Sequence, residues 1–449
     1  MVDLVYGIST FERRRGDFPV LPVINMFAES IPSEPGTALQ ARPGLEGTGV
    51  TLGDGPVRAV YTADGVLNNG LFALSDKTIY NNGIALGNIT VEGPASFAGY
   101  SDFVFINAGR EIKGYDGTTL TTIAFPDSAA VAKIMVGSSR LIAIRKDTGL
   151  FYWTDPLDVA IDSLAFATAE NSPDALKDGL YIGDKAILFG SETVEFWPAT
   201  TDSDLPFAPL PGATFPVGIK GTGMCSEFNR SFAWVTNYNE ICMGTPDTII
   251  SEPELQTRIA ASSETSLFRF YVDDNEYLAI RLDGETWAFG ARSQVWSKLE
   301  SQGEDNWLPS SYDGGVFGSS IDGRLFRWSD SAGDFDQPVI KRFRAWVPIT
   351  GQSINVANII LRTNPGTTEH LIGEYSDPVV ELRTSMDGGH TWHPWKQRTL
   401  GRQGNYRTKT IWSSLGLFGY PGLLVEVRMS DPIEFRVSGM AMNEPFGGV

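Results

Sequence analysis

Carboxylates are the most abundant side chains in this sequence that can do chemistry. The chain has 449 residues, of which 54 are Asp or Glu. Hydrolysis of a glycoside needs two carboxyl groups about 5–10 Å apart. Several neighbouring pairs are candidates: Asp202 with Asp204, Asp273-Asp274 and Glu304-Asp305. In a chain this acidic such pairs arise without a catalytic role, so we interpret them as solvated turns.

The three histidines are poorly spaced for a metal site. They are His370, His390 and His393. Residues three apart on a strand point to opposite faces, so the last two make a poor pair of ligands. The sequence also lacks HExxH, paired CxxC, GxSxG and GxxxxGKS or GxxxxGKT patterns. We therefore expect no catalytic residue, no metal and no cofactor.

One motif is a recognisable folding signal. The segment 385–392 fits the Asp-box S-x-D-x-G-x-T-W, with its defining residues at Ser385, Asp387, Gly389, Thr391 and Trp392. The Asp side chain accepts backbone N–H groups of its own turn, Gly permits the turn, and the Trp is expected to pack beneath the hairpin. The Asp-box occurs in sialidases and other propellers, but it is structural and carries no catalysis.

Charge is distributed unevenly along the chain. Residues 338–449 hold 12 basic and 9 acidic residues, a net charge of +3, whereas residues 1–337 hold 23 and 45, a net charge of −22. Such an acidic surface keeps a protein soluble, and it also repels polyanions, which argues against a protein that grips DNA by its phosphates. The only basic run is Arg13, Arg14 and Arg15, which we interpret as an exposed cluster; contact with phosphate or an acidic partner is the alternative.

The chain contains two cysteines, Cys225 and Cys242. They are expected on the first and third strands of one repeat unit, about 10 Å apart, which is too far for a disulfide. Buried thiols in a reducing cytoplasm are the resulting expectation. No stretch is apolar enough for membrane insertion, and the start of the sequence shows no secretion signal.

A repeat with a period near forty organises residues 51–335. Each copy has an apolar run of about four residues, a polar turn and a second run that ends in a large side chain. The closing residues step by 35, 38, 44, 46, 46 and 39 along the series Tyr80, Tyr115, Trp153, Trp197, Met243, Phe289 and Trp328. Repeats of this length with paired strands predict an all-β fold, a β-propeller of about seven blades.

The flanking regions differ from the repeat. Residues 1–50 are rich in proline and predict an irregular, extended segment that runs over a surface or to a neighbouring subunit. The loop 198–216 has five prolines and predicts a projecting loop with apolar contacts, a solvated turn being the alternative. Residues 336–449 alternate apolar and polar residues, which predicts a C-terminal β-sandwich or barrel. No helix is expected.

Both ends of the chain resemble one protein family. The segment 395–416, Ser430-Asp431-Pro432, Asn25-Met-Phe-Ala-Glu29 and Leu39-Gln-Ala-Arg-Pro-Gly-Leu45 resemble the packaged-DNA-stabilisation proteins of short-tailed bacteriophages, also described as tail hub or nozzle proteins. The repeat between them fits the same family. The family-like fold markers, which carry no active-site role, are Gly401, Gly404, Tyr406, Trp412 and Gly416.

The resemblance implies a structural virion protein of the tail, made in the bacterial host cytoplasm. Its expected partners are further copies of itself in a hexameric ring, the portal and adaptor above it, and tail needle, spike or fibre proteins. Packaged double-stranded DNA would be retained by the closed channel and would pass at ejection without sequence-specific binding. Sixfold rings need head-to-tail contacts, for which the candidate residues are Arg13, Arg14, Arg15, Phe207 and Leu210.

Two other functions are compatible with the sequence. The Asp-box and the many carboxylates would suit a sialidase-like, glycan-cleaving propeller, although this box lies outside the repeat and no triad of arginines for a substrate carboxylate is evident. The third interpretation is a propeller binding module for a peptide or a surface glycan.

Overall fold

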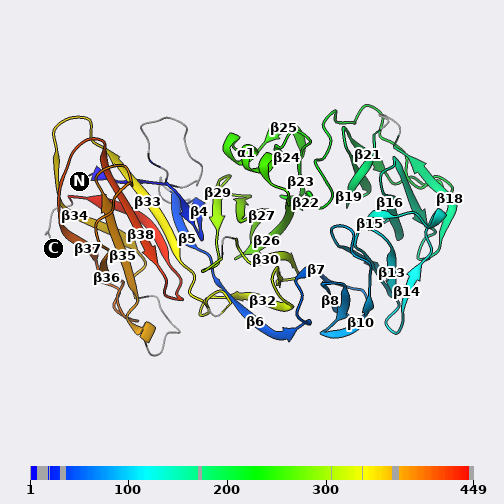
Figure 1. Ribbon diagram of the computed structural model, residues 1–449, viewed down its shortest axis with the longest axis horizontal. Helices are drawn as coiled ribbons and strands as arrows, with labels where there is room; N and C mark the ends of the chain where they lie inside the picture. Colours follow the sequence, from blue (N-terminus) through cyan, green and yellow to red (C-terminus); the bar gives the residue numbers. More distant parts are fainter. Residues whose placement is uncertain are drawn as a thin grey trace.

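The computed structural model describes residues 2–7, 19, 21–30, 37–169, 174–304, 306–335, 337–366 and 374–443. Within these ranges the protein is built almost entirely of β-strands. They form a propeller and a C-terminal β-domain that lie side by side along the long axis of the molecule (Figure 1).

The propeller consists of antiparallel units of three or four strands. The first units are β7 (Val57–Thr62), β8 (Leu71–Ser75), β9 (Thr78–Asn81) and β10 (Ile84–Asn88), then β11 (Ser96–Tyr100), β12 (Phe103–Asn107), β13 (Ile112–Tyr115) and β14 (Leu120–Ile123). Next come β15 (Val131–Gly137), β16 (Arg140–Arg145), β17 (Leu150–Thr154) and β18 (Ile161–Thr168), then β19 (Leu176–Ile182), β20 (Lys185–Gly190) and β21 (Val194–Pro198). The series continues with β22 (Cys225–Phe228), β23 (Ser231–Val235), β24 (Ile241–Met243) and β25 (Thr245–Ile249).

Two more units complete the propeller. They are β26 (Ser266–Val272), β27 (Asn275–Leu282), β28 (Glu285–Gly290) and β29 (Trp296–Leu299), and β30 (Pro309–Asp313), β31 (Val316–Ser319), β32 (Arg324–Ser329) and β6 (Gly44–Thr51). The first strand of each unit contacts the first strand of the next, and β30 contacts β7, so the units form a closed ring. The outermost strand of the last unit, β6, comes from the N-terminal segment and pairs with β32 (Figure 1).

The second strand of each unit is apolar because both of its faces are covered. On β16, Leu141 and Ala143 pack into the core shared with the preceding unit, and Ile142 and Ile144 pack into the core shared with the following unit. Successive side chains of a strand point to opposite faces. A strand buried on both faces therefore reads as a continuous apolar run, which is the pattern that produced the sequence repeat.

The C-terminal domain is a sandwich of two sheets around one core. One sheet has the order β37 (Thr410–Phe418), β34 (Ile354–Thr363), β39 (Arg436–Met442), β5 (Thr37–Ala41) and β4 (Met26–Ser30), with β1 (Val2–Asp3) beside β39. The other has the order β3 (Val23–Ile24), β33 (Lys341–Pro348), β38 (Gly422–Met429), β35 (Val379–Ser385) and β36 (Lys396–Thr399), with β2 (Val5–Tyr6) beside β33. Phe343, Val425 and Trp412 lie in the shared core.

The N-terminal segment is more regular than its proline content indicates. Its described parts form β1 to β5 in the C-terminal sandwich and β6 in the propeller. Strand β3 also pairs with β29 of the propeller, so one sheet continues from the propeller into the C-terminal domain. The segment thus joins the two bodies of its own chain.

Among the described residues, the expectation of a chain without helices is wrong at one α-helix and two short 3-10 helices, Pro126–Ser128 and Glu374–Ser376. Helix α1 (Pro253–Ala261) lies between β25 and β26, with proline in its first turn. Its buried residues Leu255 and Ile259 are four apart, as one helical face requires, and they pack against the neighbouring units. The helix has only nine residues, which is too short for the helical spacing of its apolar residues to be recognised in the sequence.

The loop 198–216 folds back on the propeller. It bridges Ala199 to Phe207 and Val194 to Phe215, and the amide of Leu210 donates to the carbonyl of Phe196 at 2.8 Å. These contacts cover the outer edge of β21 in the unit that has three strands. The loop therefore occupies the place of a fourth strand and is not a free projection.

Both cysteines have free, buried thiols, as expected, on β22 and β24. Burial raises the pKa of Cys225 well above its ordinary value, and it raises the pKa of Cys242 to about 12. The described chain contains no helix with the length and apolar character needed to cross a membrane.

Candidate functional site

The Asp-box forms a self-contained hairpin after β35. The Asp387 carboxylate accepts hydrogen bonds from the Thr391 amide at 2.9 Å, the Thr391 hydroxyl at 2.6 Å and the Ser385 hydroxyl at 2.7 Å. The Gly389 amide donates to the Ser385 hydroxyl at 2.9 Å. These hydrogen bonds, above all that from the Thr391 hydroxyl, hold the pKa of Asp387 well below its usual range. The carboxylate is thus occupied by its own turn.

The tryptophan of the box lies against Gly389 of its own hairpin and also stacks on arginines. The guanidinium carbons of Arg344 and Arg383 lie 5.0 and 4.5 Å from the Trp392 ring. Trp395 continues the stack, 4.5 Å from Arg383 and 4.1 Å from Arg428. The result is a ladder of alternating guanidinium groups and indole rings across β33, β35 and β38.

The arginines of this ladder are held by carboxylates of the same sheet. Glu426, with a fully buried side chain, accepts from Arg344 Nε at 2.5 Å and from Arg383 Nε at 2.9 Å. Glu381 accepts from Arg428. No triad of arginines was evident in the sequence, but the structure brings Arg344, Arg383 and Arg428 together. Their internal carboxylate partners occupy them, as in a structural cluster and unlike a substrate-carboxylate site.

The family-like fold markers lie between β36 and β38. Gly401, Gly404 and Gly416 have φ angles of +94°, +81° and +105°, which favour glycine. Trp412 is fully buried in the sandwich core, and its Nε1–H donates to a carbonyl of β36 at 2.7 Å. Tyr406, by contrast, is 68% exposed. The loop around it is therefore a surface feature.

The candidate assembly residues have different positions. Arg13, Arg14 and Arg15 lie outside the described residues. Leu210 is 44% exposed, so it is accessible to a partner. Phe207 is fully buried, in edge-to-face contact with Trp153 and Tyr181. The assignment of Phe207 as an assembly contact is therefore wrong, because its ring fills the core between its own unit and the preceding one.

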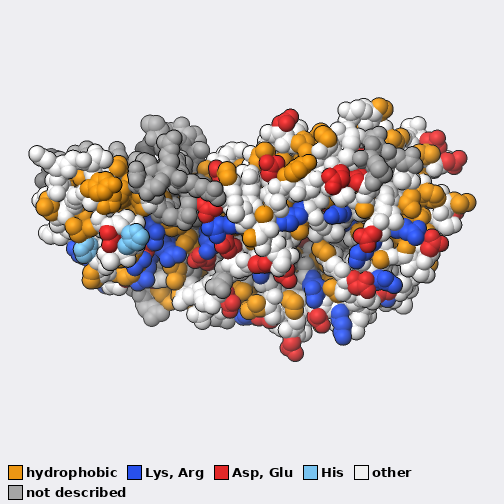
Figure 2. All heavy atoms as spheres, turned by 45° about the horizontal axis from the view of Figure 1, so that its top comes forward, with side chains coloured by type: hydrophobic (Ala, Val, Ile, Leu, Met, Phe, Trp, Pro, Cys, Tyr) orange, Lys and Arg blue, Asp and Glu red, His pale blue; other side chains and the backbone are white. Residues whose placement is uncertain are grey.

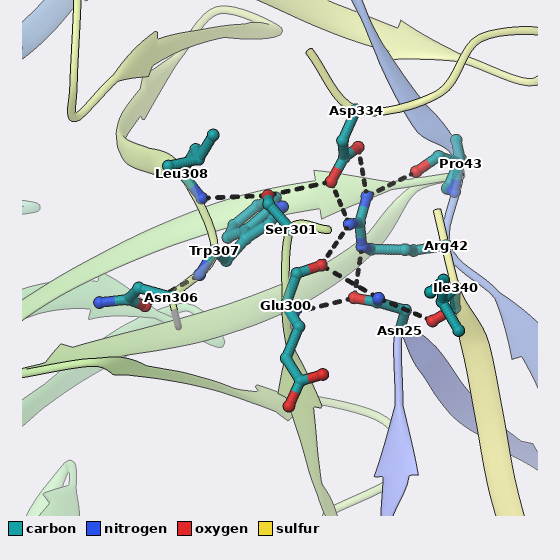
Figure 3. A network of polar contacts seen from close by, with 10 residues as sticks. All are labelled: Asn25, Arg42, Pro43, Glu300, Ser301, Asn306, Trp307, Leu308, Asp334 and Ile340. Carbon is teal, nitrogen blue, oxygen red and sulfur yellow. Dashed lines mark hydrogen bonds and ion pairs between the residues drawn. The ribbon is translucent and has the colours of Figure 1, made fainter. Parts of the chain in front are cut away.

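A buried polar network joins the propeller to the C-terminal domain (Figure 3). Arg42, between β5 and β6, uses all its guanidinium N–H groups: Nε donates to Asn25 at 2.9 Å, and the other two nitrogens donate to Asp334, to the Pro43 carbonyl at 3.0 Å and to the Glu300 carbonyl at 3.1 Å. The Arg42 and Asp334 side chains are both fully buried.

Asn25 extends this network to the start of the C-terminal domain. Its amide nitrogen donates to the carbonyls of Glu300 at 3.0 Å and Ile340 at 2.9 Å, and its oxygen accepts from the Glu300 amide at 3.0 Å. The Ser301 hydroxyl donates to Asp334 at 3.2 Å (Figure 3). No pattern in the sequence predicted this network. The available signal was that Asn25 and Arg42 stand in the two N-terminal segments that carry the family resemblance.

The described part of the chain contains no cluster of three or more His, Cys, Asp or Glu residues placed to hold a metal ion. A cavity of about 470 Å³ lies among the first strands of the propeller units, bordered by Tyr61, Lys133 and Glu227. Lys133 pairs with the buried carboxylate of Asp178 at 3.2 Å. The charged groups beside this cavity are therefore engaged in ion pairs within the chain. The candidate functional features are instead the surfaces of the propeller and of the C-terminal domain.

Comparison with solved structures gives distant likenesses. The chain is similar to the computationally designed Ika8 protein (13% identity, 73% of this chain and 98% of that chain, TM-score 0.38) and to YCF48 from Cyanidioschyzon merolae (9%, 64% and 98%, 0.40). It is also similar to the β-propeller domain of Cps50 (Swd1) from Myceliophteria thermophila (10%, 64% and 99%, 0.40). Structural similarity at TM-scores this low does not indicate a shared function. No curated protein matches the chain.

A family profile gives the decisive result. The phage stabilisation family, described as "Bacteriophage P22 Gp10, beta-propeller", matches residues 1–313. The match covers more than half of the chain and most of the propeller, and the predicted all-β propeller fold is confirmed. The chain therefore belongs to the phage stabilisation family of β-propeller proteins, which are structural proteins of bacteriophages.

Proposed function

We propose that this chain is the subunit of a ring in a short phage tail. The ring lies below the portal and its adaptor, closes the channel, retains the packaged DNA and lets it pass at ejection. The observation that carries this proposal is membership of the phage stabilisation family, whose profile spans residues 1–313. Needle, spike or fibre proteins are the expected partners on the far side of the ring.

The junction between the two bodies supports a role under mechanical load. A ring that retains packaged DNA must hold its shape against the internal pressure of the head. Arg42 and Asp334 form a buried, multiply hydrogen-bonded ion pair between the propeller and the C-terminal domain. The β3 strand also makes one sheet continuous across the same junction. A subunit with this construction transmits force between its two bodies without hinging.

The charge of the propeller supports passage of DNA without binding. Residues 44–337, which include every propeller strand, hold 19 basic and 40 acidic residues, a net charge of −21, and duplex DNA carries one negative charge per about 1.7 Å of its axis. Lys and Arg contacts to phosphate would release counterions and hold the duplex in place. A channel wall that repels DNA cannot retain it by binding, so retention of the packaged DNA depends on a narrow gate. A channel found to be lined mainly by Lys and Arg would contradict this part of the proposal.

Cosedimentation with isolated portal–adaptor complexes of the same phage tests the proposal. We expect the protein to bind and to saturate at about six copies per complex, in keeping with a closed ring. Absence of binding under conditions in which the adaptor itself stays bound to the portal would refute the proposed function. In a separate filter-binding assay, we expect no retention of a linear DNA duplex at low salt, where any phosphate contact is strongest.

A further inference from the structure

The outer end of the propeller carries an apolar and acidic patch. We call it the rim patch; it comprises Asp155, Leu157, Asp162, Leu164 and Phe166. The three apolar side chains are 59%, 83% and 42% exposed, in chain order. Within the described chain, β18 is hydrogen-bonded only to β17 and forms the edge of its sheet. The exposed apolar side chains on a free strand edge offer a site for pairing with another chain.

A bulge makes this edge protrude. Tyr152 pairs with Phe166 and Thr154 pairs with Ile161, so the stretch 162–165 on β18 faces a single residue on β17. The side chain of Asp162 accepts a hydrogen bond from the Leu164 amide at 2.9 Å and shapes the tip. The bulge therefore presents Leu164, beside an exposed carboxylate, as a knob on the propeller rim.

The far end of the C-terminal domain carries the complementary chemistry. We call it the basic face; it comprises the exposed residues Arg407, Lys409 and Tyr406 of the loop between β36 and β37. Tyr406 is 68% exposed. Within the described residues, neither Arg407 nor Lys409 makes an ion pair. Figure 2 shows Lys and Arg side chains gathered on this domain, beside two histidines.

The two surfaces have opposite charge over long stretches of sequence. Residues 147–176 hold six acidic residues and no basic one, whereas residues 388–425 hold five basic residues and no acidic one. Strand β18 and strands β36 and β37 lie at opposite ends of the long axis (Figure 1), so the surfaces cannot meet within one chain. They can meet between two copies, and a contact between two different surfaces of identical chains is heterologous, as a ring requires.

We propose that the rim patch of one copy docks on the basic face of the next copy. This inference rests on the ring proposed above and assigns the surfaces that build it. Opposite charges orient the encounter, and the Leu164 knob with Phe166 buries apolar area against Tyr406 and its neighbours.

A charge swap tests the docking on portal–adaptor complexes. The variants are Asp155→Lys with Asp162→Lys on the rim patch, Arg407→Glu with Lys409→Glu on the basic face, and the combination of all four substitutions. We expect each two-site variant to weaken ring assembly at least about tenfold, because like charges then face each other. The four-site variant restores the attraction with reversed sign and is expected to assemble again.

A cysteine pair tests the same contact with variants that change less charge. The native thiols are buried, so Leu164→Cys with Tyr406→Cys should form disulfide-linked oligomers on the portal–adaptor complex. The control pairs Tyr406→Cys with Ile84→Cys, because Ile84 on β10 is also exposed, at 70%, but lies in another unit. That control should stay monomeric on a non-reducing gel.

The outcomes separate the two proposals. Failure of the unchanged protein to bind the portal–adaptor complex overturns the proposed function. If it binds in several copies while the two-site variants assemble equally well, or the cysteine pair does not crosslink, the docking inference is wrong and the proposed function stands. Loss of assembly without recovery in the four-site variant, when all variants unfold at the same denaturant concentration, assigns these surfaces to a different partner and also overturns the inference.

Discussion

Replacement of Arg42 by methionine should destabilise the protein far more than loss of any surface arginine. Asp334 would then be a fully buried carboxylate without its cation, and the Asn25, Pro43 and Glu300 oxygens would lose their donors. Breaking a buried, hydrogen-bonded pair by removing one partner costs about 3–5 kcal/mol. The denaturant slope grows with protein size and, for a chain of 449 residues, lies above the roughly 1–3 kcal/mol/M of small proteins, so the urea midpoint should fall by about 1 M.

The matched control is Arg402→Met. Arg402 pairs with Asp377 at 3.5 Å, but both side chains are largely exposed, at 73% and 42%, so the change should cost no more than about 1 kcal/mol. Adding Asp334→Leu to Arg42→Met removes the unpaired charge and should recover part of the loss. Equal midpoints for Arg42→Met and Arg402→Met, followed by tryptophan fluorescence in urea, would refute our account of the junction.

Three further predictions concern single positions. Burial lowers the pKa of Lys341 to about 8, whereas in the unfolded chain its pKa is about 10.4, so between these two pH values the unfolded chain binds more protons. The stability of the unchanged protein relative to Lys341→Met, measured in urea titrations, should therefore rise by about 3 kcal/mol from pH 8 to pH 10.4. A stability difference that stays constant over this range would contradict the pKa shift. Phe207→Ala should cost about 3–5 kcal/mol in unfolding free energy, whereas Leu210→Ala should stay within about 0.5 kcal/mol; equal effects would place both side chains in the same environment. Gly401→Ala should lower the thermal midpoint more than Gly404→Ala. Both glycines have positive φ, but a Cβ at Gly401 would lie 2.4 Å from a hydroxyl oxygen, whereas a Cβ at Gly404 would meet open space. A larger drop for Gly404→Ala would contradict this steric explanation.

The propeller was predictable because its signal is local. A strand such as β16, covered on both faces, is apolar at its four central positions, Leu141 to Ile144, and the turns that bound such strands recur at a regular distance. The period-two alternation of β38 likewise revealed a sheet with one face in the core, including Val425 and Val427, and one face that carries Glu426 and Arg428. These patterns depend only on neighbours in the sequence.

The junction was not predictable from such patterns. Arg42 and Asp334 are separated by 292 positions, and a single arginine before a proline gives no sign of a buried partner. Phe207 was misassigned for a related reason. An aromatic residue in a polar, proline-rich loop looks like an exposed contact, but here the loop replaces a missing strand and its ring enters the core. Tertiary pairing over long distances decides both cases.

The pairing of β6 with β32 has a consequence for the order of folding during synthesis. Gly44 to Thr51 leave the ribosome early, but their partners Arg324 to Ser329 follow only after every other unit of the propeller has been made. Until then β6 has no partner in the nascent chain, and the last unit lacks its outer strand. Loop closure over such a distance is slow, and unpaired strand edges are prone to aggregate. Folding of this chain is therefore completed from its beginning and its end together, and a chain that stops short of β32 cannot close its propeller.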